Sequence, residues 1–226
     1  MTQKIVTLTF DDGWRSAITH AHPLLQKYDV PTTFYIISER IDPQFNQYMD
    51  AEDLHVLEAA GHEIGSHTRS HKHLTELSDE DIWYEITQGL NDLLALGFHP
   101  RTFAYPFGEW NPYVVKQVRE AGFFAARTIE HGINDDHVNH LLLRALAVRA
   151  NHSAEEVTSW IQDFIQGAGN WLILYFHQIE PAEILLRNQW IYGTTPAVLE
   201  GILAFLKNEN ISVKTLVDGM EILASS

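Results

Sequence analysis

Short apolar runs alternate with longer amphipathic stretches along the whole of this 226-residue chain. The apolar runs have the length and composition of buried strands and lie at 5–10, 32–37, 63–66, 102–105, 123–127, 141–147, 172–176 and 213–215. The amphipathic stretches predict helices at 16–28, 51–60, 79–96, 112–121, 154–166 and 196–208. This alternation predicts an α/β fold in which helices cover a parallel sheet.

The length of the chain narrows the architecture further. A closed eight-fold barrel usually takes about 250 residues, so we expect a distorted or incomplete (β/α) barrel, TIM-like, with seven to eight strands. An open doubly wound sheet is the alternative, but no glycine-rich phosphate loop follows the first predicted strand. No low-complexity linker or shift in composition divides the sequence, which predicts a single domain over residues 1–226.

Composition restricts the partners and the kind of metal site. A formal net charge of −15 argues against nucleic acid and anionic membrane surfaces as partners, and no apolar run reaches the roughly 18 residues of a membrane-spanning helix. The chain has no cysteine, so His, Asp or Glu must hold any metal. A strand-like pattern begins at Lys4 and leaves no room for a signal peptide. As numbered, the chain is expected to be cytoplasmic; a secreted or periplasmic protein trimmed of its leader would look the same.

Polar residues follow several predicted strands directly. Asp11 and Asp12 follow the first strand, His67 and His71 the third, and His177 the seventh. The carboxyl ends of parallel strands converge on one face, so we expect these side chains to share a site, provided that a turn brings both aspartates to one side. Two histidines four residues apart can bind one cation together. Two histidines and one carboxylate with open positions are typical of a catalytic metal site.

Each of these signals also has a purely structural interpretation. Asp11-Asp12-Gly13 is a common turn before a helix, and a loop with His67, His71 and His73 also fits a solvated histidine-rich segment. Their joint occurrence at strand ends of one small domain favours the metal site.

Four segments resemble the successive motifs of the polysaccharide deacetylases, which form carbohydrate esterase family 4 and contain a NodB-homology-type domain. They are TFDDG (9–13), HTRSH (67–71), YPFG (105–108) and LYFH (174–177), in the family's order and at family-like spacing. The resemblance extends over residues 4–217 and implies a distorted (β/α) barrel. It implies a metal-dependent hydrolase that removes N-acetyl groups from an amino-sugar-containing glycan. The alternatives are an O-acetyl (xylan-type) esterase, a small-amide hydrolase of the same fold and a non-catalytic carbohydrate-binding relative.

The resemblance also implies roles for individual residues. Asp12, His67 and His71 would bind a divalent metal, expected to be Zn²⁺, with Co²⁺, Mn²⁺ or Ni²⁺ as alternatives. Asp11 would be the catalytic base and His177 the acid. The substrate-binding segment would consist of Tyr105, Pro106, Phe107 and Gly108, with backbone near Phe107 helping to hold the oxyanion.

Two departures from the family pattern affect the site. Many members carry an arginine in the third motif that pairs with the base aspartate, and the aligned residue here is Ala104. Arg144 lies in an apolar run and is costly to bury alone, so we expect it to supply that guanidinium as a catalytic-site residue, a salt bridge at the barrel rim being the alternative. The family's Asp-Trp element, which orients the acid histidine, has no clear counterpart; Asp135 and Asp136 are candidates.

Aromatic residues near the predicted site loops have two interpretations. Trp14, Trp110 and Trp190 would either stack on sugar rings or serve as packing. The segment 192–195 resembles one that precedes the last helix in relatives and is expected to line the pocket. The expected partner is an acetylated carbohydrate, and the sequence leaves the oligomeric state open.

Overall fold

The computed structural model describes residues 3–42 and 44–224. The strands are β1 (Ile5–Phe10), β2 (Thr33–Ile36), β3 (Glu63–Ser66), β4 (Thr102–Ala104), β5 (Ala125–Arg127), β6 (Leu146–Ala147), β7 (Trp171–Phe176) and β8 (Ser212–Val213). The helices are α1 (His22–Tyr28), α2 (Ala51–Ala59), α3 (Asp79–Ala95), α4 (Pro112–Glu120), α5 (Ala154–Gln166), α6 (Ala182–Asn188), α7 (Pro196–Asn208) and α8 (Leu216–Ala224). A π-helical turn at Ala17–Ala21 precedes α1, and short 3₁₀ turns lie at Ser38–Arg40, Leu74–Glu76 and Pro106–Gly108.

The strands form one parallel sheet that curls into an incomplete barrel. Their order is β5-β4-β3-β2-β1-β7-β6, and β8 pairs with the first residues of β1. A parallel bridge between Arg127 and Leu143 links β5 to the segment before β6, so the two ends of the sheet approach each other. The predicted distorted (β/α) barrel is therefore confirmed.

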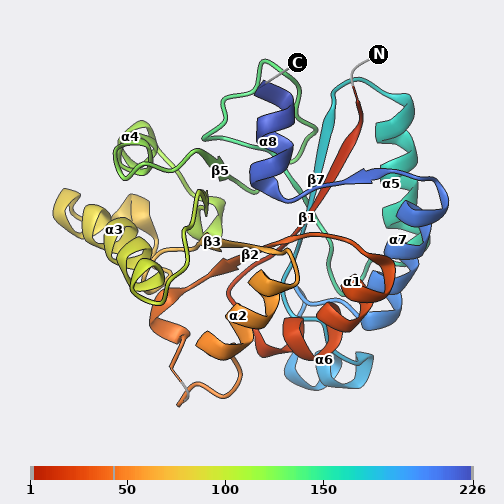
Figure 1. Cartoon of the computed structure of the whole chain (residues 1–226), viewed down its shortest axis with the longest axis horizontal. Helices are drawn as coiled ribbons and strands as arrows, with labels where there is room; N and C mark the ends of the chain where they lie inside the picture. Colours follow the sequence, from red (N-terminus) through yellow and green to blue (C-terminus); the bar gives the residue numbers. More distant parts are fainter. Residues whose placement is uncertain (1–2, 43, 225–226) are drawn as a thin grey trace.

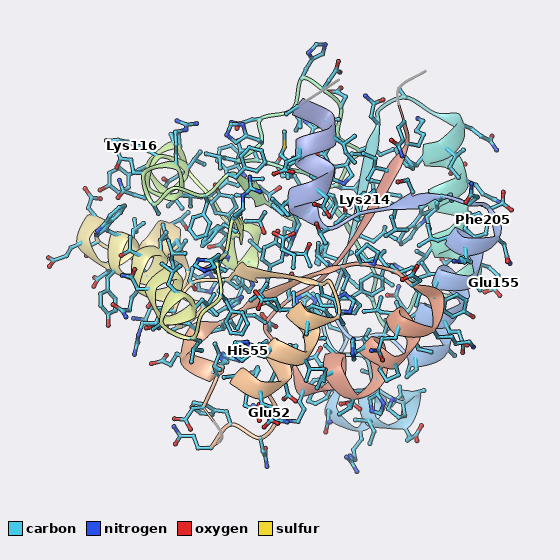
Figure 2. All side chains as sticks on the ribbon, viewed as in Figure 1. Glu52, His55, Lys116, Glu155, Phe205 and Lys214 are labelled. Carbon is cyan, nitrogen blue, oxygen red and sulfur yellow. The ribbon has the colours of Figure 1, made fainter. Side chains whose placement is uncertain are left out.

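Helices surround the curled sheet, as Figure 1 shows. Helices α3 and α4 lie together on one side of the molecule, and α1, α5 and α7 lie on the other (Figure 1). Helix α8 lies near the start of β1 and packs Leu216, Met220 and Leu223 against the inner residues of the strands. Gly219 allows this contact, because a Cβ there would lie 2.8 Å from the Trp171 ring. Exposed side chains such as Lys116 and Glu155 project from the outer faces of the helices (Figure 2).

Alternate strand residues face opposite sides of the sheet, and this alternation positions the site. On β7, Leu172, Leu174 and Phe176 belong to the outer core under the helices, whereas Trp171, Ile173 and Tyr175 belong to the inner core. On β1, Val6, Leu8 and Phe10 likewise belong to the outer core, and Ile5 belongs to the inner one. Since side chains alternate along a strand, the residues that follow β1 and β7 continue the inner series.

The structure differs from the predicted elements in three places. Helices α6 and α8 were not predicted, and the predicted strand at 141–147 is reduced to the two residues of β6. The first part of that run instead bonds to the irregular chain after β5: the Thr128 N–H donates to Leu143 O at 2.8 Å, and the Ala145 N–H donates to Glu130 O at 2.9 Å. Among the described residues, no helix has both the length and the apolar character needed to span a bilayer.

Candidate active site

Strand β1 delivers two neighbouring carboxylates to one pocket. The Asp11 N–H donates to Phe176 O at 2.9 Å and so extends the pairing with β7. Asp12 and Gly13 then have positive φ values of 71° and 75°, and this left-handed turn reverses the alternation of side chains. Both carboxylates consequently line the same pocket, of about 630 Å³. The turn that the shared site requires is therefore present.

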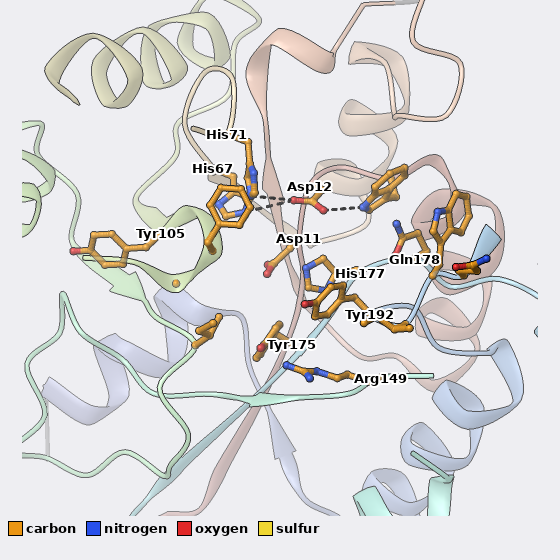
Figure 3. A pocket seen from close by; sticks show the side chains of 17 residues that line it. Asp11, Asp12, His67, His71, Tyr105, Arg149, Tyr175, His177, Gln178 and Tyr192 are labelled. Atoms are coloured by element: carbon orange, nitrogen blue, oxygen red, sulfur yellow. Dashed lines mark hydrogen bonds and ion pairs between the residues drawn. The ribbon is translucent and has the colours of Figure 1, made fainter. Parts of the chain in front are cut away.

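Three side chains converge as a candidate metal site. The Asp12 Oδ1 atom lies 3.6 Å from His67 Nε2 and 3.5 Å from His71 Nε2 (Figure 3). The three candidate ligand atoms lie within 4.8 Å of one another. Asp12 Oδ2 accepts a hydrogen bond from Trp14 Nε1 at 2.9 Å, but Oδ1 is buried and has no hydrogen-bond partner among the described residues. A buried acceptor without a partner is unusual, and a cation would satisfy it.

The protonation of the two histidines also fits a metal site. His67 Nδ1 donates to the Ala104 carbonyl at 2.7 Å, so Nε2 keeps its lone pair and faces Asp12. Burial lowers the pKa of His67 well below its ordinary value. Burial also lowers the pKa of His71, although the Asp12 carboxylate opposes that shift. Neutral imidazoles are the form that binds metal, so the donor set fits a divalent cation.

Helix α3 supports the loop that carries the two histidines. Glu85, which is buried, accepts hydrogen bonds from the Ser70 N–H at 2.8 Å and the Ser70 hydroxyl at 2.6 Å. Gly89 lets the loop approach the helix, because a Cβ there would lie 2.5 Å from the Thr68 carbonyl carbon. Thr68 and His71 both have left-handed backbone conformations, at φ values of 66° and 62°. The packing against α3 holds this strained loop in place.

Asp11 is paired with a buried arginine from β5. Arg127 Nη2 donates to Asp11 Oδ1 at 2.5 Å, and the two side chains are 0% and 4% exposed. The guanidinium carbon also lies 5.3 Å from the Tyr35 ring centroid and 4.9 Å from that of Tyr175. Burial alone would lower the pKa of Arg127, but the Asp11 carboxylate, Tyr35 and Tyr175 together outweigh burial, and the pKa is raised. The ion pair fixes the position of the Asp11 carboxylate.

The prediction that Arg144 provides this guanidinium is wrong. Arg144 is exposed, and its neighbours Leu143 and Ala145 belong to the inner core, so the alternation of side chains directs residue 144 outward. It is also absent from the ion pairs that the described residues form, so the rim salt bridge is not observed either. Arg127 had a signal in the sequence, because it is the last residue of a predicted strand and strand ends carry the site.

The opposite wall of the pocket contains His177 between two tyrosines. Its ring centroid lies 5.9 Å from that of Tyr175 and 5.6 Å from that of Tyr192. In the described part of the chain, no carboxylate lies within ion-pairing distance of His177. Asp135 and Asp136 are exposed and do not line the pocket, so the structure does not bring either of them to this histidine.

The segment predicted to bind substrate is divided by the structure. Tyr105, Phe107 and Gly108 line the pocket, whereas Pro106 is buried and does not. The Tyr105 hydroxyl donates to Leu141 O at 3.0 Å and is therefore used within the protein. Phe107 lies at the pocket edge and is 44% exposed. The centroid of its ring lies 4.5 Å from that of the His71 ring. Its backbone has a left-handed φ of 57°, and the oxyanion role of this segment stays a prediction.

Aromatic residues form part of the remaining wall. Trp14 and Trp190 line the pocket with ring centroids 5.7 Å apart. Of the segment 192–195, which was predicted to line the pocket, Tyr192 does so and the other three residues do not. Trp110 lies elsewhere and donates its indole N–H to Glu130 at 3.0 Å. The pocket also contains Arg149, which the sequence pattern did not single out.

Comparison with known proteins identifies the family of the chain. The family model described as polysaccharide deacetylase matches residues 1–126. The peptidoglycan-N-acetylglucosamine deacetylase of Bacillus cereus is 34% identical over 122 residues, which make up 54% of this chain and 54% of that protein. Chitin deacetylase 1 of Saccharomyces cerevisiae is 36% identical over 115 residues, or 50% of this chain and 35% of that protein. The chain thus matches only about half of the length of the first of these relatives.

A solved structure extends the likeness to nearly the whole chain. A family 4 acetyl xylan esterase from Clostridium thermocellum, in complex with a cobalt ion, has a TM-score of 0.67 at 22% identity over 97% of this chain and 91% of that one. A likeness at this identity shows a shared fold. Since the family model matches more than half of the sequence, the chain belongs to the polysaccharide deacetylase family.

Proposed function

We propose that this chain is a metal-dependent hydrolase that removes N-acetyl groups from an amino-sugar-containing glycan. The observation that carries the proposal is the convergence of Asp12, His67 and His71 around a buried, unpartnered carboxylate oxygen. The Asp11–Arg127 pair and His177 lie beside it in the same pocket. The names of the relatives in Bacillus cereus and Saccharomyces cerevisiae support an N-acetylated substrate.

Asp12, His67 and His71 would hold the cation, with Zn²⁺ as the expected ion and Co²⁺, Mn²⁺ or Ni²⁺ as alternatives. When bound, a divalent cation supplies Lewis-acid chemistry, which polarises an acetyl carbonyl and makes water more acidic. Three protein ligands leave positions open for other groups, as in catalytic sites and in contrast to closed structural ones.

Asp11 would act as the general base. Arg127 engages its Oδ1 atom, so Oδ2 is the oxygen that would take a proton from the attacking water. The buried ion pair keeps the carboxylate in one orientation, and orientation is a large part of what a catalytic base needs. As the water oxygen bonds to the acetyl carbon, that carbon becomes tetrahedral.

His177 would act as the general acid from the other wall of the pocket. When the carbon–nitrogen bond breaks, the electron pair stays on nitrogen, and a proton from the His177 ring would give a neutral amine. Expulsion of an unprotonated amide nitrogen is very unfavourable, so this proton matters for amides in particular. The products would be acetate and the free amino sugar.

The test is to measure acetate and free amine together for the metal-reconstituted protein on N-acetylglucosamine oligomers, peptidoglycan fragments, O-acetyl xylan and small cyclic amides. The proposal expects equal amounts of acetate and amine from an N-acetyl glycan. Asp11→Asn is the matched control, because it keeps the shape of the side chain but cannot accept the proton. Acetate without amine from xylan would favour the esterase alternative, and glycan binding without any release would favour a non-catalytic relative.

A further inference from the structure

Arg149 occupies the pocket but has no part in the hydrolysis described above. It lies two residues after β6, at the carboxyl end of the strand. Ala145 belongs to the inner core and Ala147 packs against it, so the alternation of side chains directs Arg149 to the same inner side. Arg149 is the only arginine or lysine among the described residues that line the pocket.

The guanidinium of Arg149 packs against aromatic rings without an acidic partner. Its central carbon lies 5.1 Å from the Tyr192 ring centroid. Figure 3 shows the side chain extending towards Tyr175, on the Tyr192 side of the pocket. Its Nε is buried and has no hydrogen-bond partner among the described residues. The arginine ion pairs of the described chain involve Arg15, Arg69, Arg101 and Arg127, and Arg149 is not one of them.

This unpaired charge contrasts with the composition of the chain. The protein has 30 aspartates and glutamates against 15 lysines and arginines. Acidic side chains that could pair with Arg149 are therefore plentiful in the chain. Arg127, the other arginine on the inner side of the sheet, has such a partner in Asp11. A partly desolvated guanidinium is costly unless an anion pairs with it, and planar bidentate pairing with a carboxylate is what this group favours.

We propose that Arg149 binds a carboxylate carried by the substrate glycan and thereby makes the enzyme selective for acidic glycans. Tyr192 contacts both Arg149 and His177, so the carboxylate would lie on the His177 side of the reacting acetamide. A single guanidinium balances one negative charge. A phosphate monoester carries up to two negative charges, and a site for it would be expected to contain more than one cationic side chain. The inference rests on the proposed function and names the class of glycan.

The test compares pairs of N-acetylated oligosaccharides that differ only in a carboxylate, placed either on the sugar ring, as in a uronic acid, or on an ether substituent. Arg149→Met keeps most of the length of the side chain and removes its charge and its donors. Arg149→Lys keeps the charge without the planar fork. Arg187→Met is the matched control, because Arg187 is exposed on α6 and its loss changes the net charge equally.

The wild type should prefer the acidic member of one pair by about tenfold or more in kcat/KM. Arg149→Met should remove that preference through KM and leave the neutral substrate within about threefold of the wild type. Arg149→Lys should lose most of the preference, and Arg187→Met should retain it. Whichever pair shows the preference identifies the position of the carboxylate.

Two results would overturn the inference. Equal losses on acidic and neutral substrates in Arg149→Met would mean that the arginine only holds Tyr192 in place. Equal turnover of both by the wild type would remove the selectivity while leaving the deacetylase function intact. If no substrate is hydrolysed, the function itself fails. Calorimetric binding of the acidic oligosaccharide to the wild type and to Arg149→Met then still decides whether Arg149 binds the carboxylate.

Discussion

The Asp11–Arg127 pair gives the sharpest stability prediction. Arg127→Met removes the charge and leaves the Asp11 carboxylate, which is 4% exposed, without its partner. Removal of one member of a buried ion pair costs about 3–5 kcal/mol, because the other charge stays buried. With a urea m-value of about 2–3 kcal/mol/M, the unfolding midpoint should fall by about 1–2.5 M. Asp11→Asn should be destabilising for the same reason, since Arg127 is fully buried.

A double-mutant cycle separates this pair from general damage to the core. Asp11→Asn combined with Arg127→Met leaves no unpaired charge, so its loss of stability should be clearly smaller than the sum of the two single losses. Urea unfolding in the presence of a chelator excludes any contribution from bound metal. The control is Arg101→Met, which breaks an ion pair with Glu221 in which both side chains are 51% exposed and should cost less than about 1 kcal/mol.

The reasoning is refuted if Arg127→Met costs no more than Arg101→Met. It is also refuted if the single losses add without coupling, because the pair would then not act as a unit.

Three further predictions concern other parts of the molecule. Burial lowers the pKa of His62 to about 4, so His62 is protonated at a higher pH in the unfolded chain than in the folded one. The free energy of unfolding should therefore fall by about 3 kcal/mol as the pH is lowered from about 6.5 to 4. Urea midpoints across this range should fall less in His62→Gln, and parallel curves for the two proteins would contradict the assignment. Gly89→Ala places a Cβ 2.5 Å from the Thr68 carbonyl carbon, so it should cost about 1–3 kcal/mol and lower metal occupancy, as urea unfolding and elemental analysis would show; wild-type stability and metal content together would disprove the close packing. His177→Ala should reduce kcat/KM on an N-acetyl glycan on the order of a hundredfold and far less on an activated aryl acetate, and equal reductions would remove the acid role.

Much of the fold follows from the periodicity of the sequence. The apolar run of β7 and the amphipathic stretch of α5 each have one clear interpretation, and their order predicts a parallel sheet with helices around it. The same reasoning placed Asp11, Asp12, His67, His71 and His177 at strand ends, and the structure brings all five to one pocket. Strand ends are predictable because parallel strands present their carboxyl ends to one side.

The remaining features depend on details that periodicity does not carry. Helix α8 follows β8 almost directly and continues its apolar run, so the sequence there does not distinguish a strand from a short buried helix. The choice between Arg127 and Arg144 depends on which residues of a strand face inward. In the run at 141–147, Leu143 and Ala145 face the inner core, so Arg144 between them faces outward. The same alternation would have pointed to Arg149.

The central claim is that Asp12, His67 and His71 form a site for one catalytic divalent cation. Calorimetric titration of Zn²⁺ into chelator-treated protein tests it most directly, with Asp12→Ala, His67→Ala and His71→Ala as variants and His73→Ala as the control. His73 lies in the same loop but pairs with Glu109. We predict one Zn²⁺ per chain in the wild type and the control, loss of that binding in the three variants, and unchanged circular dichroism throughout. Full binding in any of the three variants, or no stoichiometric binding in the wild type, would contradict the account.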